Sequence, residues 1–307
     1  MATPTSDDDW KVHALNVHGG FFEQKVASII NDYNPKKLFF ITSEYPVRVA
    51  QEESRLDVLG FIPYSINPNS GSGIYLTIEC KKHNADFVDW VFFPTIQNQL
   101  FGVDYSQCAF LKTYPYNNEF LVKTKIELSK KRYTNKPISG DSREVRGTYK
   151  DVSNGIKTKT SNSSITEASY QVTLATHSII NEHIRLNDEN IKHNQNSLFG
   201  VYIYVPVIVT TANLYLLDYK VDDIDTLTGE IAFDKTKLNP VNWLWYEYPI
   251  PPHLQLDMEV DNSDKMTTIN NLRNFDYAVR RNIMVVNSAK IEEALSWLIQ
   301  FQHNAFD

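Results

Sequence analysis

The chain has 307 residues, of which 42% are hydrophobic and 22% are charged, so it can bury a large core. The longest nearly apolar run, Leu198 to Val209, is too short to span a bilayer. The acidic start at Asp7 to Asp9 does not resemble a signal peptide. The two cysteines, Cys80 and Cys108, exclude a disulfide scaffold and a four-cysteine zinc site. We therefore expect a cytoplasmic globular protein with no membrane partner.

The net charge of −7 argues against a nucleic-acid partner, but the charge is unevenly distributed. Between residues 123 and 160, eleven basic side chains and four acidic ones give +7, which leaves −14 for the rest of the chain. Such a segment is typical either of a solvated loop or of an arm that contacts phosphates, and both readings stay open. The candidate nucleic-acid-binding residues are Lys82, Lys130, Lys131, Arg132, Lys136, Arg143 and Arg146.

The first part of the chain shows a helix followed by strands. After a polar tail at residues 1–18, apolar residues at helical spacing predict a helix from Phe22 to Tyr33. Short strands are expected at 37–42 and 55–62, followed by a turn at Asn67 to Gly73. Ile74 to Lys81 then alternates between apolar and polar residues, which predicts a half-buried strand.

The rest of the chain predicts more strands and two helices. The aromatic stretch 85–100 is expected to be partly helical, and residues 130–163 to be a basic flexible loop or linker. Ser164 to Glu167 has the pattern of a capping box, which predicts a helix reaching about Asn194. The remaining predictions are strands at 108–111, 119–126, 201–211, 214–219, 243–248 and 282–286, and a closing helix at 291–301.

Two carboxylates and a lysine are expected to meet on neighbouring strands. Glu79 and Lys81 are two residues apart on a strand, so their side chains project from the same face. If the preceding strand pairs with this one as a hairpin, Asp57 lies beside them. Two carboxylates with a backbone carbonyl suit Mg²⁺, and a nearby lysine can orient the attacking water in phosphodiester hydrolysis.

The tripeptide (Asp/Glu)-x-Lys alone has little specificity, because it occurs four times here. The copy at Asp9 lies in the tail, and the copy at Glu23 lies on a helix, where residues i and i+2 diverge. Asp218-Tyr219-Lys220 ends an apolar strand and is a real competitor. Only Glu79 is preceded by a strand that carries an acid and a tight turn.

With these residues, the chain resembles the PD-(D/E)xK nuclease superfamily, and Gly19 to Glu23 resembles the Phe-Glu signature of its Mrr-type branch. Leu56 stands where the family name would place a proline. The resemblance covers roughly Gly19 to Phe110. It implies an α/β fold with a restriction-endonuclease-like mixed central sheet flanked by helices, made of a core at 19–129 and a C-terminal extension at 164–307 that adds strands and helices.

The resemblance also implies an activity and a site. The activity would be that of a Mg²⁺-dependent DNA endonuclease, with Mn²⁺ as a substitute, in a prokaryotic defence setting. Asp57, Glu79 and the Cys80 carbonyl would bind the metal, Glu23 would support it, and Lys81 would position the water. Gln97 and Gln99 are candidates for an accessory residue that many relatives carry on the next helix.

Several alternatives remain open. Asp57, Glu79 and Lys81 would form an exposed salt-bridged strand face in a protein without a site, and Glu23 is favoured near a helix start in any case. A catalytically inactive nucleic-acid-binding or assembly module would show the same pattern. Homo-oligomerisation and a regulatory protein partner that gates activity also stay open. His177 and His183 are six residues apart on one helix, which predicts ordinary surface or packing histidines and no shared metal site.

Overall fold

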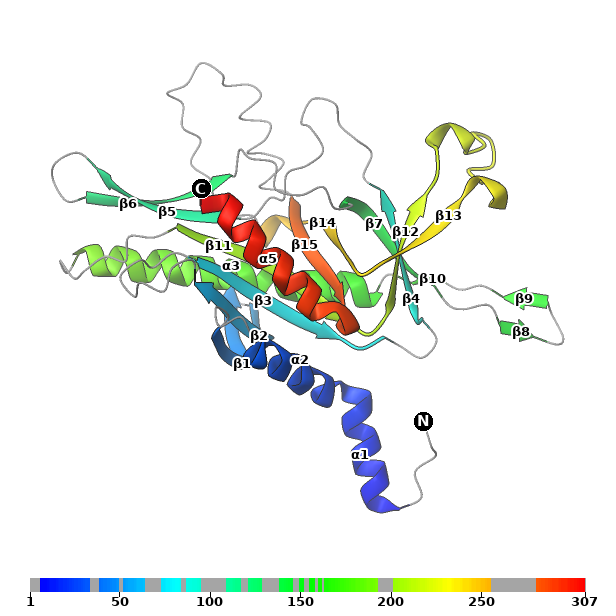
Figure 1. The fold of residues 1–307 in the computed structure, drawn as a ribbon, viewed down its shortest axis with the longest axis horizontal. Helices are drawn as coiled ribbons and strands as arrows, with labels where there is room; N and C mark the ends of the chain where they lie inside the picture. The colour runs from blue at the N-terminus through cyan, green and yellow to red at the C-terminus, as the bar shows by residue number, and fades with distance from the viewer. Residues whose placement is uncertain are drawn as a thin grey trace.

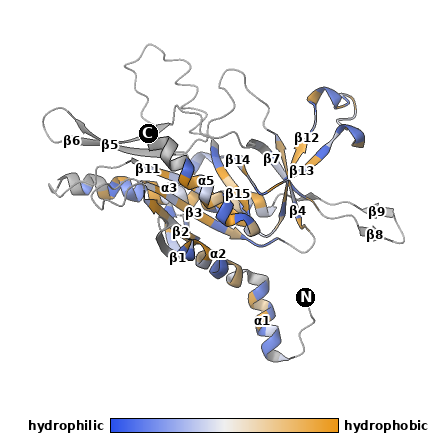
Figure 2. Ribbon diagram, viewed as in Figure 1, coloured by the Kyte–Doolittle hydropathy of each residue, from blue (hydrophilic) through white to orange (hydrophobic). Residues whose placement is uncertain are grey.

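Strands rich in valine, isoleucine and tyrosine form the middle of a mixed sheet (Figures 1 and 2). The computed structural model describes residues 6–33, 39–49, 52–63, 73–83, 87–94, 109–116, 121–128, 138–145, 149–151, 155–157, 160–161, 163–192, 201–254 and 280–306. Within these ranges the protein is α/β, with helices on both faces of the sheet.

The helices are α1 (Asp7–His18), α2 (Gly20–Asp32), α3 (Ser163–Lys192) and α5 (Ile291–Phe306), with the short 3₁₀ turns η1 (Val221–Asp223), η2 (Phe233–Lys235), η3 (Pro252–Leu254) and η4 (Ser288–Lys290). The strands are β1 (Phe39–Val49), β2 (Glu52–Pro63), β3 (Gly73–Lys81), β4 (Asp89–Pro94), β5 (Ala109–Tyr116), β6 (Leu121–Leu128), β7 (Ile138–Val145), β8 (Tyr149–Asp151), β9 (Gly155–Lys157), β10 (Thr160–Ser161), β11 (Val201–Thr210), β12 (Asn213–Asp218), β13 (Lys237–Val241), β14 (Trp243–Pro249) and β15 (Arg280–Asn287).

The main sheet joins the two halves of the chain. Its order is β1-β2-β3-β11-β15-β14-β7-β4-β12-β13, with β5 and β6 attached at β11 and β10 attached at β7. β1, β2 and β3 form an antiparallel meander, and β11 runs parallel to β3 along its whole length. Two parallel strands need a crossover connection between them. Helix α3 lies in the connection from β3 to β11 and packs on the sheet.

The start of β3 requires a glycine. Gly73 lies opposite Pro63 in the ladder with β2. A Cβ at this position would come within 2.6 Å of the Ile62 carbonyl oxygen. The Gly-rich segment before β3 therefore ends in a residue that lets two backbones approach closely.

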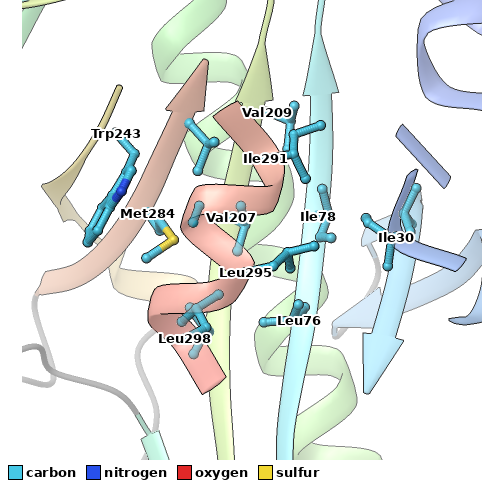
Figure 3. Close-up of a cluster of buried hydrophobic side chains, with 14 of the residues drawn as sticks. Ile30, Leu76, Ile78, Val207, Val209, Trp243, Met284, Ile291, Leu295 and Leu298 are labelled. Carbon is cyan, nitrogen blue, oxygen red and sulfur yellow. The ribbon is translucent and has the colours of Figure 1, made fainter. Parts of the chain in front are cut away.

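Helices α2 and α5 cover one face of the sheet. Val26 and Ile30 of α2 and Leu295 and Leu298 of α5 are buried against apolar residues of the central strands. Figure 3 shows α5 lying over these strands, with Met284 among the side chains beneath it. This face is the largest apolar cluster in the described part of the chain.

Helix α3 covers the opposite face. Ala175, Ile179 and Ile180 of α3 pack against residues of β1, β2 and β11, and Ile165, Ala168 and Val172 pack further along the sheet. The hydroxyls of Thr77 on β3 and Thr176 on α3 lie 2.6 Å apart in a buried hydrogen bond. Strand β3 is therefore buried on both faces, and the prediction of a half-buried strand was wrong because α3 covers its polar face.

The polar tail predicted at residues 1–18 is helical over most of its length, as α1. The hydroxyl of Ser6 accepts the Asp9 amide at 3.1 Å and the Asp9 carboxylate accepts the Ser6 amide at 3.0 Å, which is a capping box. Gly19 has φ 83°, a left-handed conformation that ends α1 and allows α2 to begin at once. We did not predict this helix, because its sequence signal is the capping box at Ser6 and not a pattern of apolar residues.

One further prediction was wrong, and another is tested only in part. Within the stretch 85–100, expected to be partly helical, residues 89–94 form β4 in the sheet, where the aromatic side chains Trp90 and Phe92 are fully buried, and residues 85, 86 and 95–100 lie outside the described residues. Residues 138–145, expected to lie in the basic loop, form β7 between β14 and β4. Few apolar residues mark β7, because Ser139, Ser142 and Glu144 take buried positions in it through hydrogen bonds.

The predicted helix at α2, the later strands and the closing helix α5 are confirmed, with bounds that differ by a few residues. Residues 214–219, predicted as a strand, form β12, which pairs with β4 and β13. The predicted turn at 67–73 lies outside the described residues except for Gly73. No helix in the described part of the chain has the length and apolar content that crossing a membrane requires.

We expect Leu298→Ala to destabilise the protein by about 2–4 kcal/mol, because it removes buried methyl groups and leaves a cavity beneath α5. Leu298 is 1% exposed. Leu227→Ala is the matched control, since Leu227 is 94% exposed. Urea unfolding of both variants measures the difference, and an equal loss in the two would contradict the assignment of α5 to the core.

Candidate functional site

The sheet splits at Asp57. β2 pairs with β3 only as far as Val58 opposite Ile78, whereas its pairing with β1 continues to Glu52. In continued register, Cys80 would face Leu56. Instead, the Cys80 amide donates to the Asp57 carboxylate at 2.7 Å. The Asp57 side chain thus takes the place of the next backbone acceptor where the two strands separate.

Glu79 is buried beside this split. It is 6% exposed, and its Oε2 atom has no hydrogen-bond partner among the residues that the structure describes. A buried carboxylate oxygen normally has a partner, because leaving it without one is costly. Glu79 is therefore either protonated or available to a cation.

Lys81 lies on the same strand and reaches α3. Its ammonium group donates to Oε2 of Glu167 at 2.9 Å, and its side chain is 23% exposed. Its positive charge acts on both Asp57 and Glu79, where it favours the ionised carboxylates. Lys81 therefore lies close enough to both acids to belong to the same site.

Glu23 joins the group from the first turn of α2. Its charge raises the pKa of both Asp57 and Glu79, and its own pKa is raised by burial and by Glu44. Glu44 of β1 has φ 47°, which is uncommon for a residue other than glycine, and its carboxylate accepts Arg55 at 2.7 Å. The charges of four acids and one lysine, from three strands and a helix, thus act on one another around the split.

Burial and mutual repulsion keep protons on this group. Desolvation first and the neighbouring acids second raise the pKa of Glu79 to about 9. Desolvation also raises the pKa of Asp57, to about 6, although its hydrogen bond from Cys80 opposes the shift. At neutral pH Glu79 therefore holds a proton in the absence of a cation, and such shifts are typical of functional sites.

The Cys80 carbonyl has a direction that suits a ligand at the split between β2 and β3. In a regular strand the N–H and C=O of one residue point to the same neighbour, and the Cys80 amide points to Asp57. The carbonyl therefore faces the same gap. The Cys80 side chain is buried in the apolar cluster under α2 and α5, as expected.

The predicted nucleic-acid contacts are only partly described. Lys82 donates to the Asn16 carbonyl at 2.8 Å, in the last turn of α1, and Arg143 pairs with Asp141 beside it. Both side chains thus have partners within the chain. The other candidates, Lys130, Lys131, Arg132, Lys136, Arg146, Gln97 and Gln99, lie outside the described residues, as does Cys108.

The histidines pack in the interior, as expected. His183 Nδ1 lies 2.6 Å from the Tyr204 hydroxyl, and burial lowers the pKa of His183 to about 4. Burial and the charge of Arg281 lower the pKa of His177 to about 3. Both histidines are therefore neutral packing residues.

Sequence reasoning missed Glu167 and Glu44. The pattern Ser164-x-x-Glu167 predicted a capping box, but the Ser164 amide and hydroxyl donate to Glu144 of β7, at 2.6 and 3.0 Å, and Glu167 pairs with Lys81. That prediction was therefore wrong. An acidic residue near the start of a helix was a visible signal, but no spacing rule places this part of the helix beside β3.

The donor set suits a hard cation. No group of three or more His, Cys, Asp or Glu side chains in the described part of the chain is arranged to hold a metal ion. Mg²⁺ is commonly bound by one or two carboxylates, with water in its other positions. Asp57, the unpartnered oxygen of Glu79 and the Cys80 carbonyl fit that requirement.

Scans against models of protein families, against curated proteins and against solved structures each found no match to this chain.

We expect the metal-free protein to lose stability as the pH rises from about 5 towards 9. Above its ordinary pKa of 4.5, Glu79 ionises in the unfolded chain but keeps its proton in the folded protein up to about 9, so the folded state binds more protons. Glu79→Gln should remove much of this loss, on the order of 1 kcal/mol or more between pH 5 and 8. Urea unfolding in the presence of a chelator, repeated at several pH values, measures this loss of stability.

Glu182→Gln is the control for this prediction. Glu182 lies on the surface of α3 and its pKa is lowered, chiefly by its hydrogen bond from Arg185. It should not reproduce the effect of Glu79→Gln. If wild type and Glu79→Gln show the same pH dependence, Glu79 is ionised in the folded protein and the assigned proton is absent.

Proposed function

We propose that the protein is a Mg²⁺-dependent nuclease that hydrolyses phosphodiester bonds, with DNA as its substrate. The observation that carries the proposal is the convergence of Asp57, Glu79 and Lys81, with Glu23 beside them, where β2 leaves β3. Acids that lie close together in a buried place repel one another, and a bound cation would relieve this repulsion on displacing the retained proton.

The order of elements also supports the proposal. A helix, a strand, an Asp-bearing strand, a Glu-x-Lys-bearing strand and a helix follow one another as α2, β1, β2, β3 and, after an insertion, α3. This is the order on which the resemblance to the PD-(D/E)xK superfamily depends. We propose that the core is restriction-endonuclease-like and that α3 and β11 belong to it, with residues 82–162 as an insertion.

Each residue has a role in this proposal. Asp57 and Glu79 hold the cation with the Cys80 carbonyl, and the low-dielectric surroundings strengthen their charge interactions. Glu23 adds negative charge on the α2 side. Lys81 donates a hydrogen bond to the attacking water and offsets charge on the phosphate. A bound Mg²⁺ supplies charge stabilisation and a more acidic water.

DNA as the substrate and a defence role rest on the resemblance and on the +7 segment at residues 123–160. The competing function is a non-catalytic nucleic-acid-binding or assembly module with the same fold. It is favoured by one observation, that the Lys81 ammonium is already held by Glu167. Cleavage assays discriminate the two.

We expect the purified protein to cleave plasmid DNA with Mg²⁺ or Mn²⁺ and not with chelator. Asp57→Asn and Lys81→Ala should each lower the rate by roughly 100-fold or more, because each removes charge stabilisation at the reacting phosphate. Gel analysis of timed digests, with RNA in a parallel series, provides the measurement.

Asp218→Asn is the matched control for cleavage, because Asp218-Tyr219-Lys220 repeats the motif at the end of β12. It should keep full activity. Cleavage by wild type and by the Asp57 and Lys81 variants at equal rates would overturn the proposal, and RNA cleavage alone would overturn its DNA part.

We also expect Mn²⁺ to raise the melting temperature of the wild type, since a ligand that binds only the folded state stabilises it. Asp57→Asn should abolish the shift by removing a ligand, and Asp218→Asn should retain it. Thermal unfolding with and without Mn²⁺ measures the shift. About 1 to 10 equivalents of Mn²⁺ are needed to saturate a site of micromolar affinity. A shift that survives in Asp57→Asn places the cation elsewhere.

A further inference from the structure

The lysine of the proposed site forms an ion pair with helix α3, which carries none of the acids of that site. Lys81 extends from β3 to Glu167 on α3, where Nζ and Oε2 lie 2.9 Å apart. Lys81 is 23% exposed, in contrast to 74% for Lys11 in the surface pair with Asp8. The Lys81 side chain therefore lies in a more restricted space than a surface lysine, and its ammonium group donates to Glu167, whose side chain is 58% exposed.

The turn that carries Glu167 is itself held in place. The Glu144 carboxylate of β7 accepts the amides of Ser164 and Ile165 at 2.6 and 3.2 Å, and the Ser164 hydroxyl at 3.0 Å. Glu144 is 1% exposed. A carboxylate that accepts the first amides of a helix satisfies groups that otherwise lack partners and interacts favourably with the helix dipole.

A continuous set of contacts therefore connects β7 to the site. It passes from Glu144 to the first turn of α3, then from Glu167 to Lys81. Ile165 and Ala168, in the same turn and the next, are fully buried, so this end of α3 cannot shift without disturbing the core.

We propose that Glu167 is a positioning residue that holds the Lys81 ammonium for the reaction, and that Glu144 fixes the turn that carries it. This inference rests on the proposed function. Glu167 does not touch the substrate in this arrangement. It limits the directions that a flexible side chain of four methylenes can take, which reduces the ordering that the reaction requires.

The competing explanation is an ordinary ion pair with no role. Exposed pairs contribute little to stability, so Glu167→Gln should leave the unfolding free energy nearly unchanged in either case. Stability alone therefore does not discriminate, and the measurements must report on Lys81.

The first test is labelling of Lys81 by acetic anhydride in a chelator, followed by mass spectrometry. Glu167→Gln should raise the labelling rate of Lys81 about two- to fivefold, the factor that corresponds to loss of one partly exposed ion pair. Lys11 serves as the internal reference, and Glu182→Gln, in the exposed pair with Arg185, is the matched control variant. Equal labelling in wild type and Glu167→Gln would overturn the inference, whether or not the protein cleaves DNA.

The second test uses the cleavage rate. Glu167→Gln should lower kcat about tenfold with little change in KM, because positioning acts on the reaction and not on binding of the nucleic acid. In a Lys81→Ala background it should have no further effect, since it acts only through Lys81. Additive losses in the double variant would overturn the inference.

Glu144→Gln extends the test to the helix turn. It keeps the shape of the side chain but weakens the interaction with the amides of α3, so it should raise Lys81 labelling in the same direction as Glu167→Gln. Unchanged labelling in a folded Glu144→Gln protein would remove Glu144 from the proposal. If no variant or wild-type protein cleaves any substrate, the proposed function fails while the labelling result still stands for the ion pair.

Discussion

The site depends on one interaction, the hydrogen bond from the Cys80 amide to the Asp57 carboxylate. Elsewhere β3 has β2 on one edge and β11 on the other, and helices cover both of its faces. A strand in such surroundings cannot leave a backbone amide without an acceptor. The Asp57 side chain lets β2 depart from β3 while that amide stays satisfied, and Glu79 lies beside the point of departure.

This arrangement stores unfavourable energy. Burial of Glu79 near Asp57 and Glu23 requires protonation or a cation, and a stable core alone would favour an apolar residue at that position. Conflicts of this kind are expected where function constrains a fold. The surrounding layers supply the apolar burial that offsets the cost, with Ile78 and Cys80 against α2 and α5 on the same strand.

Much of the architecture near the site was predictable because its signals are local. Alternating residues predicted β3, and spacing of two predicted that Glu79 and Lys81 share a face. The cover by α3 was not predictable, because it depends on a crossover that ends more than a hundred residues later. For the same reason Glu167 was assigned to a helix cap, and the buried serines of β7 were assigned to a loop.

The pairing of β3 with β11 has a consequence for synthesis of the chain. All four predicted catalytic residues emerge by Lys81, but β11 begins at Val201, so β3 lacks one of its neighbours until then. Pairings between distant segments form late, and an unpaired edge exposes apolar surface meanwhile. A ribosome-bound chain therefore carries the four predicted catalytic residues for a long interval without the closed, buried environment that raises the pKa of Glu23, Asp57 and Glu79.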